Sequence, residues 1–264
     1  MTRRGPRPSG GFTRRRQELR LIPLGTLPEV IRGTDLSALI AGAAAREGVK
    51  FEAGDVLVLA QKIVSKAEGR TVVLATVKPS SLALEWAPQL GQDPRVTEVV
   101  LRESRRVIRM TERALIVETR HGFVCANAGV DRSNVPGGKV TCLPDDPDAS
   151  ARRIANRLRR RTGLSIPVIV SDTFGRPWRL GLVNVAIGAS GLHVMEDLRG
   201  TRDNYGHSLR ATVLAVADEL AAAAGLLMKK NEAVPAVIVR GFRYRPGRES
   251  AQQLLRPATE DIFR

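Results

Sequence analysis

The sequence has few of the features that mark membrane, exported or disulfide-stabilised proteins. The most apolar stretch, residues 211–228, is interrupted by Asp218 and Glu219, so no uninterrupted apolar run of about 18 residues exists to span a membrane. No apolar region follows the basic N-terminus, as it would in an export signal. Two cysteines, Cys125 and Cys142, are too few for a disulfide scaffold or a cysteine-based zinc site. These absences predict a cytoplasmic protein with buried, reduced cysteines.

Common signatures of nucleotide binding and catalysis are also absent. The sequence contains no G-x-x-x-x-G-K-[ST] phosphate loop, no G-x-G-x-x-G turn, no H-E-x-x-H pair and no nucleophile elbow. The three histidines, His121, His193 and His207, lack the spacing of a helical metal pair. A classical P-loop or Rossmann domain is therefore disfavoured.

Positive charge is what the sequence has in excess. The net charge of +15 suits an anionic partner such as nucleic acid, a membrane surface or a phosphorylated small molecule. The Arg-rich segment 1–18 cannot bury enough apolar surface to fold and is expected to be a disordered tail. A second arginine cluster, at 152–161, is typical of a solvated helix face. Aromatic residues make up only 4% of the chain, so the stacking platforms of single-strand binders are missing and nucleic acid is an unlikely partner.

Apolar periodicity predicts a mixture of helices and strands. Helices are expected at 35–46, 79–91, 148–161 and 208–228, the last being the longest, and strands at 19–23, 166–171, 183–187 and 234–239. Residues 55–70 are expected to be a buried strand that runs into a loop, and 96–128 a set of antiparallel strands with one solvated face. The fold class predicted is α+β, with mixed sheets, helices and two intimately joined lobes. Residues 243–264 are expected to form a polar C-terminal tail.

Three segments carry residue types suited to phosphate and metal chemistry. In the first, Gln61 to Arg70, two lysines, a serine, a glutamate and an arginine follow a buried strand. Lysine and arginine neutralise phosphoryl charge, and Ser65 and backbone N–H groups can donate to phosphate oxygens. A solvated strand end explains the same composition equally well.

The second segment is a glycine-rich loop that contains Asp131 and Asn134. A carboxylate and a carboxamide three residues apart offer the hard oxygen ligands that Mg²⁺ and Mn²⁺ prefer. Asp and Asn beside glycine are also ordinary turn residues, and that explanation is the more common one.

In the third segment Asp172 and Thr173 follow an apolar strand, with Arg176, Trp178 and Arg179 close behind. The carboxyl end of a buried strand is where open sheets place ligand-binding groups. A turn would need the aspartate and a glycine but not two arginines and a tryptophan. Here the functional interpretation is favoured.

Seven motifs, in order, resemble the coenzyme F420-0:L-glutamate ligase family. They are LIPLGT, DVLVLAQKIVSKAEGR, CANAGVDRSNVPGG, VIVSDTFGRPWRLGLVNVAIGASG, DLRGTRDNYGH, ADELAAAAGLLM and VPAVIVRGF. The resemblance covers residues 19–242, which would be the ligase domain. It implies an α+β fold without a classical phosphate loop, an intertwined homodimer, GTP as co-substrate, Mg²⁺ or Mn²⁺ as metal, and an assisting K⁺.

The resemblance also assigns roles to individual residues. Asp131 and Asp172 match metal-binding aspartates, and Thr173 matches a ligand of a second metal. The matches to nucleotide contacts are Leu21, Ile22, Pro23, Leu24, Gly25, Gln61, Lys62, Lys66 and Asn134. Asp131, Asp172 and Lys66 are thereby expected to be catalytic.

The implied reaction is phosphoryl transfer from GTP to a carboxylate of the coenzyme, followed by attack of L-glutamate on the acyl phosphate. Lys62, Lys66, Arg176 and Arg179 are candidates for holding the anionic substrates. One departure is visible, because Lys229 and Lys230 stand where archaeal members have a glycine followed by an amide or acid. A protonated lysine cannot coordinate a metal, so a lysine contacts phosphate there or water completes the metal shell. A ligase for another acidic substrate, or a basic nucleic-acid-binding protein, are the alternatives.

Overall fold

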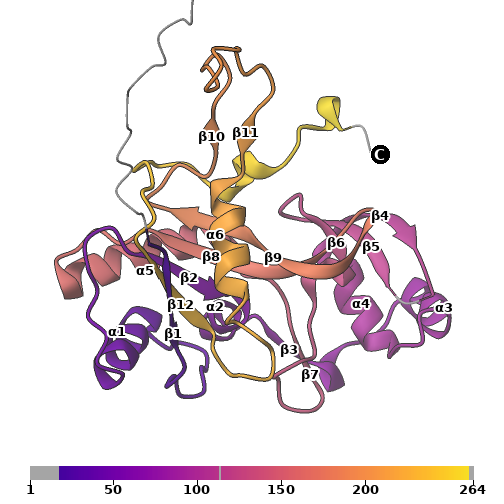
Figure 1. Cartoon of the computed structure of the whole chain (residues 1–264). Helices are drawn as coiled ribbons and strands as arrows, with labels where there is room; N and C mark the ends of the chain where they lie inside the picture. Colours follow the sequence, from indigo (N-terminus) through magenta and orange to yellow (C-terminus); the bar gives the residue numbers. More distant parts are fainter. Residues whose placement is uncertain (1–17, 113, 262–264) are drawn as a thin grey trace, which may run out of the picture.

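A five-stranded mixed sheet forms the centre of the protein. The computed structural model describes residues 18–112 and 114–261. The strands follow the order β1 (Arg20–Leu24), β12 (Ala236–Arg240), β2 (Val56–Ala60), β8 (Val168–Arg176) and β9 (Arg179–Ser190) (Figure 1). β2 and β8 run parallel, and the other neighbours are antiparallel. The predicted α+β class with mixed sheets is confirmed, while the division into two lobes stays a prediction.

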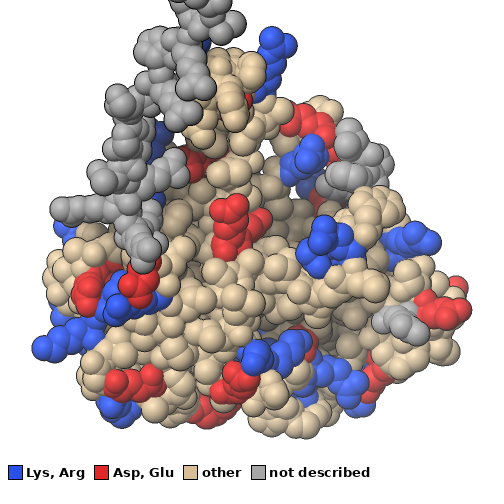
Figure 2. All heavy atoms as spheres, in the orientation of Figure 1, with Lys and Arg blue, Asp and Glu red and all other residues tan. Residues whose placement is uncertain are grey.

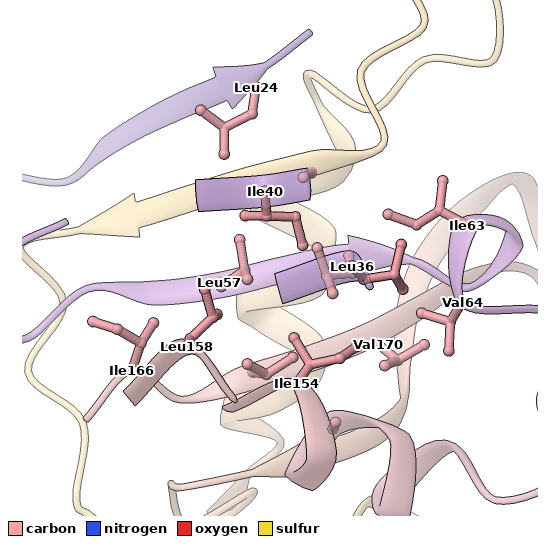
Figure 3. Packing of buried hydrophobic residues seen from close by; sticks show 14 of the residues in the cluster. Leu24, Leu36, Ile40, Leu57, Ile63, Val64, Ile154, Leu158, Ile166 and Val170 are labelled. Carbon is pink, nitrogen blue, oxygen red and sulfur yellow. The ribbon is translucent and has the colours of Figure 1, made fainter. Parts of the chain in front are cut away.

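Both faces of this sheet are covered, as the unbroken apolar run of its central strand β2 requires. Leu57 of β2 packs toward α1 (Leu36–Arg46) and α5 (Pro147–Thr162) (Figure 3), and Leu59 belongs to the same buried cluster. Val56 and Val58 face the opposite side, where α6 (Val216–Gly225) lies across the sheet in Figure 1. Successive side chains of a strand point to opposite faces, so an unbroken apolar run needs cover on both.

The remaining elements form smaller units around the central sheet. They are η1 (Leu74–Thr76), α3 (Ser81–Gln89), α4 (Pro94–Glu103), β4 (Ser104–Met110), β5 (Leu115–Thr119), β6 (Val124–Ala126) and η2 (Asn127–Gly129), the β-ladder of β3 (Thr71–Val73) with β7 (Lys139–Thr141), and the hairpin of β10 (Glu196–Asp197) with β11 (Val213–Leu214). β4, β5 and β6 form an antiparallel sheet that packs on α4 through its own apolar cluster. Phe123 meets Phe174 of β8 edge-on at 6.2 Å between ring centres, which ties this sheet to the central one.

Two predictions along the chain are wrong, and both mistake a helix for something else. Residues after Ala60 form helix α2 (Gln61–Glu68) instead of a loop, which Gly69 ends in a left-handed conformation. Residues 96–103, expected among antiparallel strands, belong to α4. Asp93 caps α4 and Pro94 is its first residue, a start signal that the alternation of apolar and charged residues had hidden.

Two other elements have different lengths from those expected. The long helix predicted at 208–228 is confined to Val216–Gly225, because Val213 and Leu214 pair with β10, and α5 with 16 residues is longer. β8 continues through Arg176 and forms a hairpin with β9, so Asp172 lies within a strand instead of at its end.

The helix at 35–46 is confirmed, and Asp35 is its N-cap; the strands near 19–23 and 234–239 are also confirmed. Both cysteines are free and buried, as expected. No helix in the described ranges is long and apolar enough to cross a membrane.

The chain ends differ in how much of them the structure describes. The Arg-rich tail lies outside the described residues up to position 17. The C-terminal residues include η3 (Ala251–Leu254) and η4 (Ala258–Glu260). Ala251 is buried, and its N–H donates to Asp148 Oδ1 at 2.8 Å, an atom that also accepts from the N–H of Ala189 in β9. This carboxylate anchors the C-terminal segment to the central sheet.

Candidate functional site

A pocket of about 410 Å³ opens at the carboxyl end of β2, next to Ser171, Asp172 and Thr173 of β8. Its walls come from the loop after β1, the first turns of α2, the 131–134 loop, strands β8 and β9, and the 228–235 loop. In Figure 2, blue Lys and Arg side chains gather in the lower middle of the face shown, where Figure 1 places the loop between α6 and β12. The pocket therefore joins segments that are far apart in the sequence.

Helix α2 begins directly after β2, and this brings Lys62 into the pocket. Its Nζ donates to Asp131 Oδ2 at 2.8 Å and to the carbonyl and hydroxyl oxygens of Ser133, each at 2.6 Å. The Lys62 side chain is only 14% exposed. A lysine that is mostly buried needs such acceptors for its charge, so the contact between α2 and the 131–134 loop is well fixed.

Asp131 is held from its backbone as well as its side chain. Its N–H donates to Thr141 O at 3.0 Å, and Thr141 N–H donates back at 2.9 Å, which attaches the loop to β7. Burial by itself would raise the pKa of Asp131, but hydrogen bonds from Lys62 and from the Ser133 N–H and hydroxyl outweigh it and lower the pKa to about 2. Asp131 is consequently a carboxylate at every physiological pH.

Asp172 and Thr173 enter the pocket because β8 is longer than its parallel neighbour. The last β2 pair is Ala60 with Ser171, and the next two residues of β8 continue past the end of β2. Burial raises the pKa of Asp172 to about 6, and repulsion by Asp131 adds to the rise. The Thr173 N–H and the charges of Lys230 and Lys62 act in the other direction. The Thr173 hydroxyl donates to Asn184 Oδ1 of β9 at 3.1 Å.

Two further lysines reach the pocket, one from the same helix and one from the 228–235 loop. Lys66, one turn beyond Lys62 on α2, donates to Glu29 Oε1 at 2.6 Å. Lys230 lies 3.4 Å from Asp131 Oδ2, and its backbone carbonyl accepts a 3.1 Å hydrogen bond from the Asn134 side chain. Asn134 has φ of +53°, a left-handed conformation that asparagine tolerates better than most residues. These bonds connect the 131–134 loop to the 228–235 loop across the pocket mouth.

The oxygen atoms of this pocket fit Mg²⁺ or Mn²⁺. Asp131, Asp172 and Thr173 supply two carboxylates and a hydroxyl, the hard donors that these ions prefer. The mutual repulsion of the two carboxylates is what a divalent cation between them would relieve. In the described part of the chain, no three His, Cys, Asp or Glu residues form a metal cluster. A metal here would need the hydroxyl, water or substrate oxygens to complete its shell.

Most of the site residues expected from sequence meet in this pocket. Those lining it are Gln61, Lys62, Lys66, Asp131, Asn134, Asp172 and Thr173, joined by Lys229 and Lys230. The expected nucleotide contacts Leu21, Ile22, Pro23, Leu24 and Gly25 belong to β1 and the residue after it and do not line the pocket, so their role stays a prediction. Leu24 is fully buried in the core. Arg176 and Arg179 also lie outside the lining, and Arg176 donates to Leu180 O within its own hairpin.

The polar pocket residues that sequence reasoning missed are Glu29, Asn184 and Asn231. Asn184 had a visible signal, since it is the one amide in the apolar run Leu182 to Ile187. Glu29 had none, because its importance comes from Lys66, which is 37 positions further along the chain.

This α+β protein, which lacks a classical phosphate loop, brings lysines together with carboxylate and hydroxyl oxygens in one pocket of a mixed sheet. The chain matches the model of the F420-0:gamma-glutamyl ligase family over residues 25–241. It is 48% identical over 247 residues to the coenzyme F420:L-glutamate ligase of Methanothermobacter thermautotrophicus, with 92% of this chain and 98% of the relative covered. The corresponding enzyme of Methanopyrus kandleri is 47% identical, with 93% and 98% covered. The chain belongs to the F420-0:gamma-glutamyl ligase family.

Proposed function

We propose that this chain is a GTP-dependent ligase that joins L-glutamate to coenzyme F420-0, through an acyl phosphate and with Mg²⁺ or Mn²⁺ bound. Its family membership supports the ligase activity and the two substrates. The observation that carries the proposal is the meeting of Asp131, Asp172 and Thr173 with Lys62 and Lys66 in one pocket.

The reaction has two chemical steps. The terminal phosphoryl group of GTP passes to the carboxylate of the coenzyme, which gives an acyl phosphate and GDP. The amino group of L-glutamate then attacks the acyl carbon, forms the amide bond and expels phosphate. Every reactant is an anion, so mutual repulsion is the first obstacle to bringing them together. The pocket lysines reduce that repulsion.

The lysines differ in how readily they can turn to a phosphate. Lys66 is paired with Glu29, whose side chain is 69% exposed and can find water when the lysine moves. Lys62 has three acceptors around it and is held in place. Lys66 is therefore the mobile partner for the nucleotide phosphates, and Lys62 fixes the loop that carries Asp131.

Asp131, Asp172 and Thr173 would hold the metal. When bound, a divalent cation would supply positive charge that offsets the negative charge of the transferred phosphoryl group. The protein's part is to present these oxygens from a strand and a hydrogen-bonded loop, which keeps them in place without reorganisation. A potassium ion completes the ion requirement that we propose.

Exposed apolar side chains support the proposal of a homodimer. The tip of the β8–β9 hairpin carries Trp178, Leu180 and Leu182, which are 85%, 98% and 64% exposed. Tyr205, on the β10–β11 arm, is 88% exposed. Large apolar residues gathered at exposed positions are typical of interfaces. We expect Leu180→Asp to shift a dimer toward monomer in sedimentation experiments.

One assay tests the proposed activity. Purified protein is incubated with F420-0, L-glutamate, Mn²⁺, K⁺ and either GTP or ATP, and the deazaflavin products are identified by mass spectrometry. We expect products heavier by one or more glutamyl groups, formed at least about tenfold faster with GTP. Equal rates would refute the GTP assignment, and no glutamylated product with either nucleotide would refute the ligase activity.

A further inference from the structure

Asn184 is a polar residue in an apolar strand, and its position relates it to the proposed metal site. It lies between Val183 and Val185 in β9 and is the register partner of Thr173 in β8. Both residues line the main pocket. We propose that Asn184 is a positioning residue that orients the Thr173 hydroxyl toward a divalent metal. This inference rests on the proposed function, because it assumes that the pocket binds metal.

The argument begins with the direction of one hydrogen bond. The Thr173 hydroxyl donates its proton to Asn184 Oδ1 at 3.1 Å. A hydroxyl has one proton and two lone pairs, so fixing the proton on the neighbouring strand leaves the lone pairs for a cation. A free hydroxyl could rotate and point its proton at the cation. Groups that orient metal ligands in this way commonly contribute tenfold to a hundredfold in metal affinity.

Helix α6 supports Asn184 from behind. A Cβ atom added at Gly225 would lie 2.9 Å from Asn184 Cγ and 3.2 Å from its Cβ, closer than atoms can pack without movement. Gly225 is the last residue of α6 and does not have a positive φ, so the backbone conformation does not require glycine there. The absence of a side chain is explained instead by the close approach of Asn184. Glycine at position 225 has a low helix propensity, but it leaves the space that the Asn184 side chain occupies.

The test measures Mn²⁺ binding, by calorimetry and by the electron paramagnetic resonance of the ion, without turnover. We expect Asn184→Ala to weaken binding by about tenfold or more. Asn184→Asp keeps the acceptor and should bind at least as tightly as wild type. In a Thr173→Val background, Asn184→Ala should cause no further loss, because the hydroxyl it orients is gone. Additive losses in the double variant, or wild-type binding by Asn184→Ala, would overturn the inference.

Gly225→Ala provides a second route that leaves both polar residues in place. A Cβ at position 225 would push against Asn184, so a purely structural role predicts lower stability with unchanged Mn²⁺ affinity. Displacement of Asn184 predicts weaker Mn²⁺ binding despite a folded protein, and unchanged affinity counts against the inference. Failure of the proposed function is recognised separately. In that case wild type and Asp172→Asn would bind Mn²⁺ equally poorly, and both proposals would fall.

Discussion

Asp131 and Asp172 line the same pocket, yet their surroundings shift their pKa values in opposite directions. Asp131 accepts hydrogen bonds from the Lys62 ammonium and the Ser133 N–H and hydroxyl, and its pKa falls to about 2. Asp172 has no such ammonium contact at its oxygens among the described hydrogen bonds, and burial raises its pKa to about 6. The charge of Asp131 is compensated by hydrogen bonds from the protein, whereas Asp172 is the carboxylate that we propose a divalent cation compensates.

This difference in pKa predicts that the charge of Asp131 contributes to stability, whereas the charge of Asp172 contributes to function. A compensated carboxylate contributes to folding, and removing its partner leaves a buried charge. An uncompensated one costs free energy in the metal-free protein and is retained for what it binds. Substitutions at the two sites should therefore have opposite consequences for stability, even though both reduce activity.

Asp172→Asn should cause the largest loss of activity. The amide keeps the shape and one acceptor oxygen but removes the charge that offsets a divalent cation. We expect turnover to fall by about a thousandfold, or about 4 kcal/mol of barrier, together with Mn²⁺ affinity. The measurements are kcat with GTP and calorimetric titration of Mn²⁺. Near-normal turnover, with the same rise in Tm on adding Mn²⁺, would show that Asp172 is not a metal ligand.

Lys62→Met should reverse this pattern by damaging the fold more than Asp172→Asn does. Asp131 would lose its closest charged partner, and a partly buried carboxylate without one costs about 1–3 kcal/mol. Activity should fall about tenfold to a hundredfold because the 131–134 loop is released. Denaturant unfolding in the presence of EDTA measures the first effect. Lys78→Met, which removes an exposed lysine outside the pocket lining, is the control and should leave both quantities unchanged.

The raised pKa of Asp172 predicts a pH range in which wild type and Asp172→Asn differ in stability. The folded pKa of about 6 lies above the ordinary value of 3.8, so the folded protein holds this proton more tightly than the unfolded chain does. Stability from this group is full below about pH 4 and is lost as pH rises through 6. Metal-free Asp172→Asn should thus be more stable than wild type at pH 7.5, by no more than about 3 kcal/mol.

The comparison with wild type cancels the titration of all other carboxylates. The stability difference should shrink as pH falls and disappear near pH 4. Chemical unfolding of both proteins in EDTA at pH 4, 6 and 7.5 measures it. A constant difference across these pH values would mean that Asp172 is not the group that titrates.

The sequence was most informative where a local pattern determines structure. Asp35 is an N-cap followed by an apolar period, and β2 is an unbroken apolar run, so both elements could be predicted from a few adjacent residues. Helix α2 could not. Its eight residues are mostly polar, and they form a helix because Ile63 and Val64 pack into the core beneath the pocket. That packing partner lies elsewhere in the chain.

The site shows the same limit. Asp131 and Asp172 were identified as separate candidates, but their opposite pKa shifts depend on Lys62, 69 positions away from Asp131, and on burial by the folded sheet. Asn184 joins the site only through the register of the β8–β9 hairpin. Residue types indicated the chemistry, whereas the pairing of charges required the tertiary structure.

Lys230→Met should have the smallest effect, and it tests the departure seen at the 228–235 loop. Its ammonium is 3.4 Å from Asp131 and the side chain is 60% exposed, so water screens most of the attraction. Asp131 retains Lys62, and stability should change by less than about 0.5 kcal/mol. If Lys230 instead meets a phosphate group when the pocket fills, KM for GTP should rise a few fold to about tenfold while kcat stays within about twofold.

Lys229→Met is the matched control. Lys229 also lines the pocket, but its ammonium pairs with Glu232 at 2.7 Å and not with Asp131. It removes the same charge from the same loop, so a general electrostatic effect of the loop would raise KM equally in both variants. A specific role of Lys230 requires that its KM change exceed that of Lys229→Met, and that the excess persist at high salt, where unspecific attraction is screened. Equal KM changes that disappear at high salt would mean that both lysines act only through unspecific electrostatic attraction at the pocket mouth.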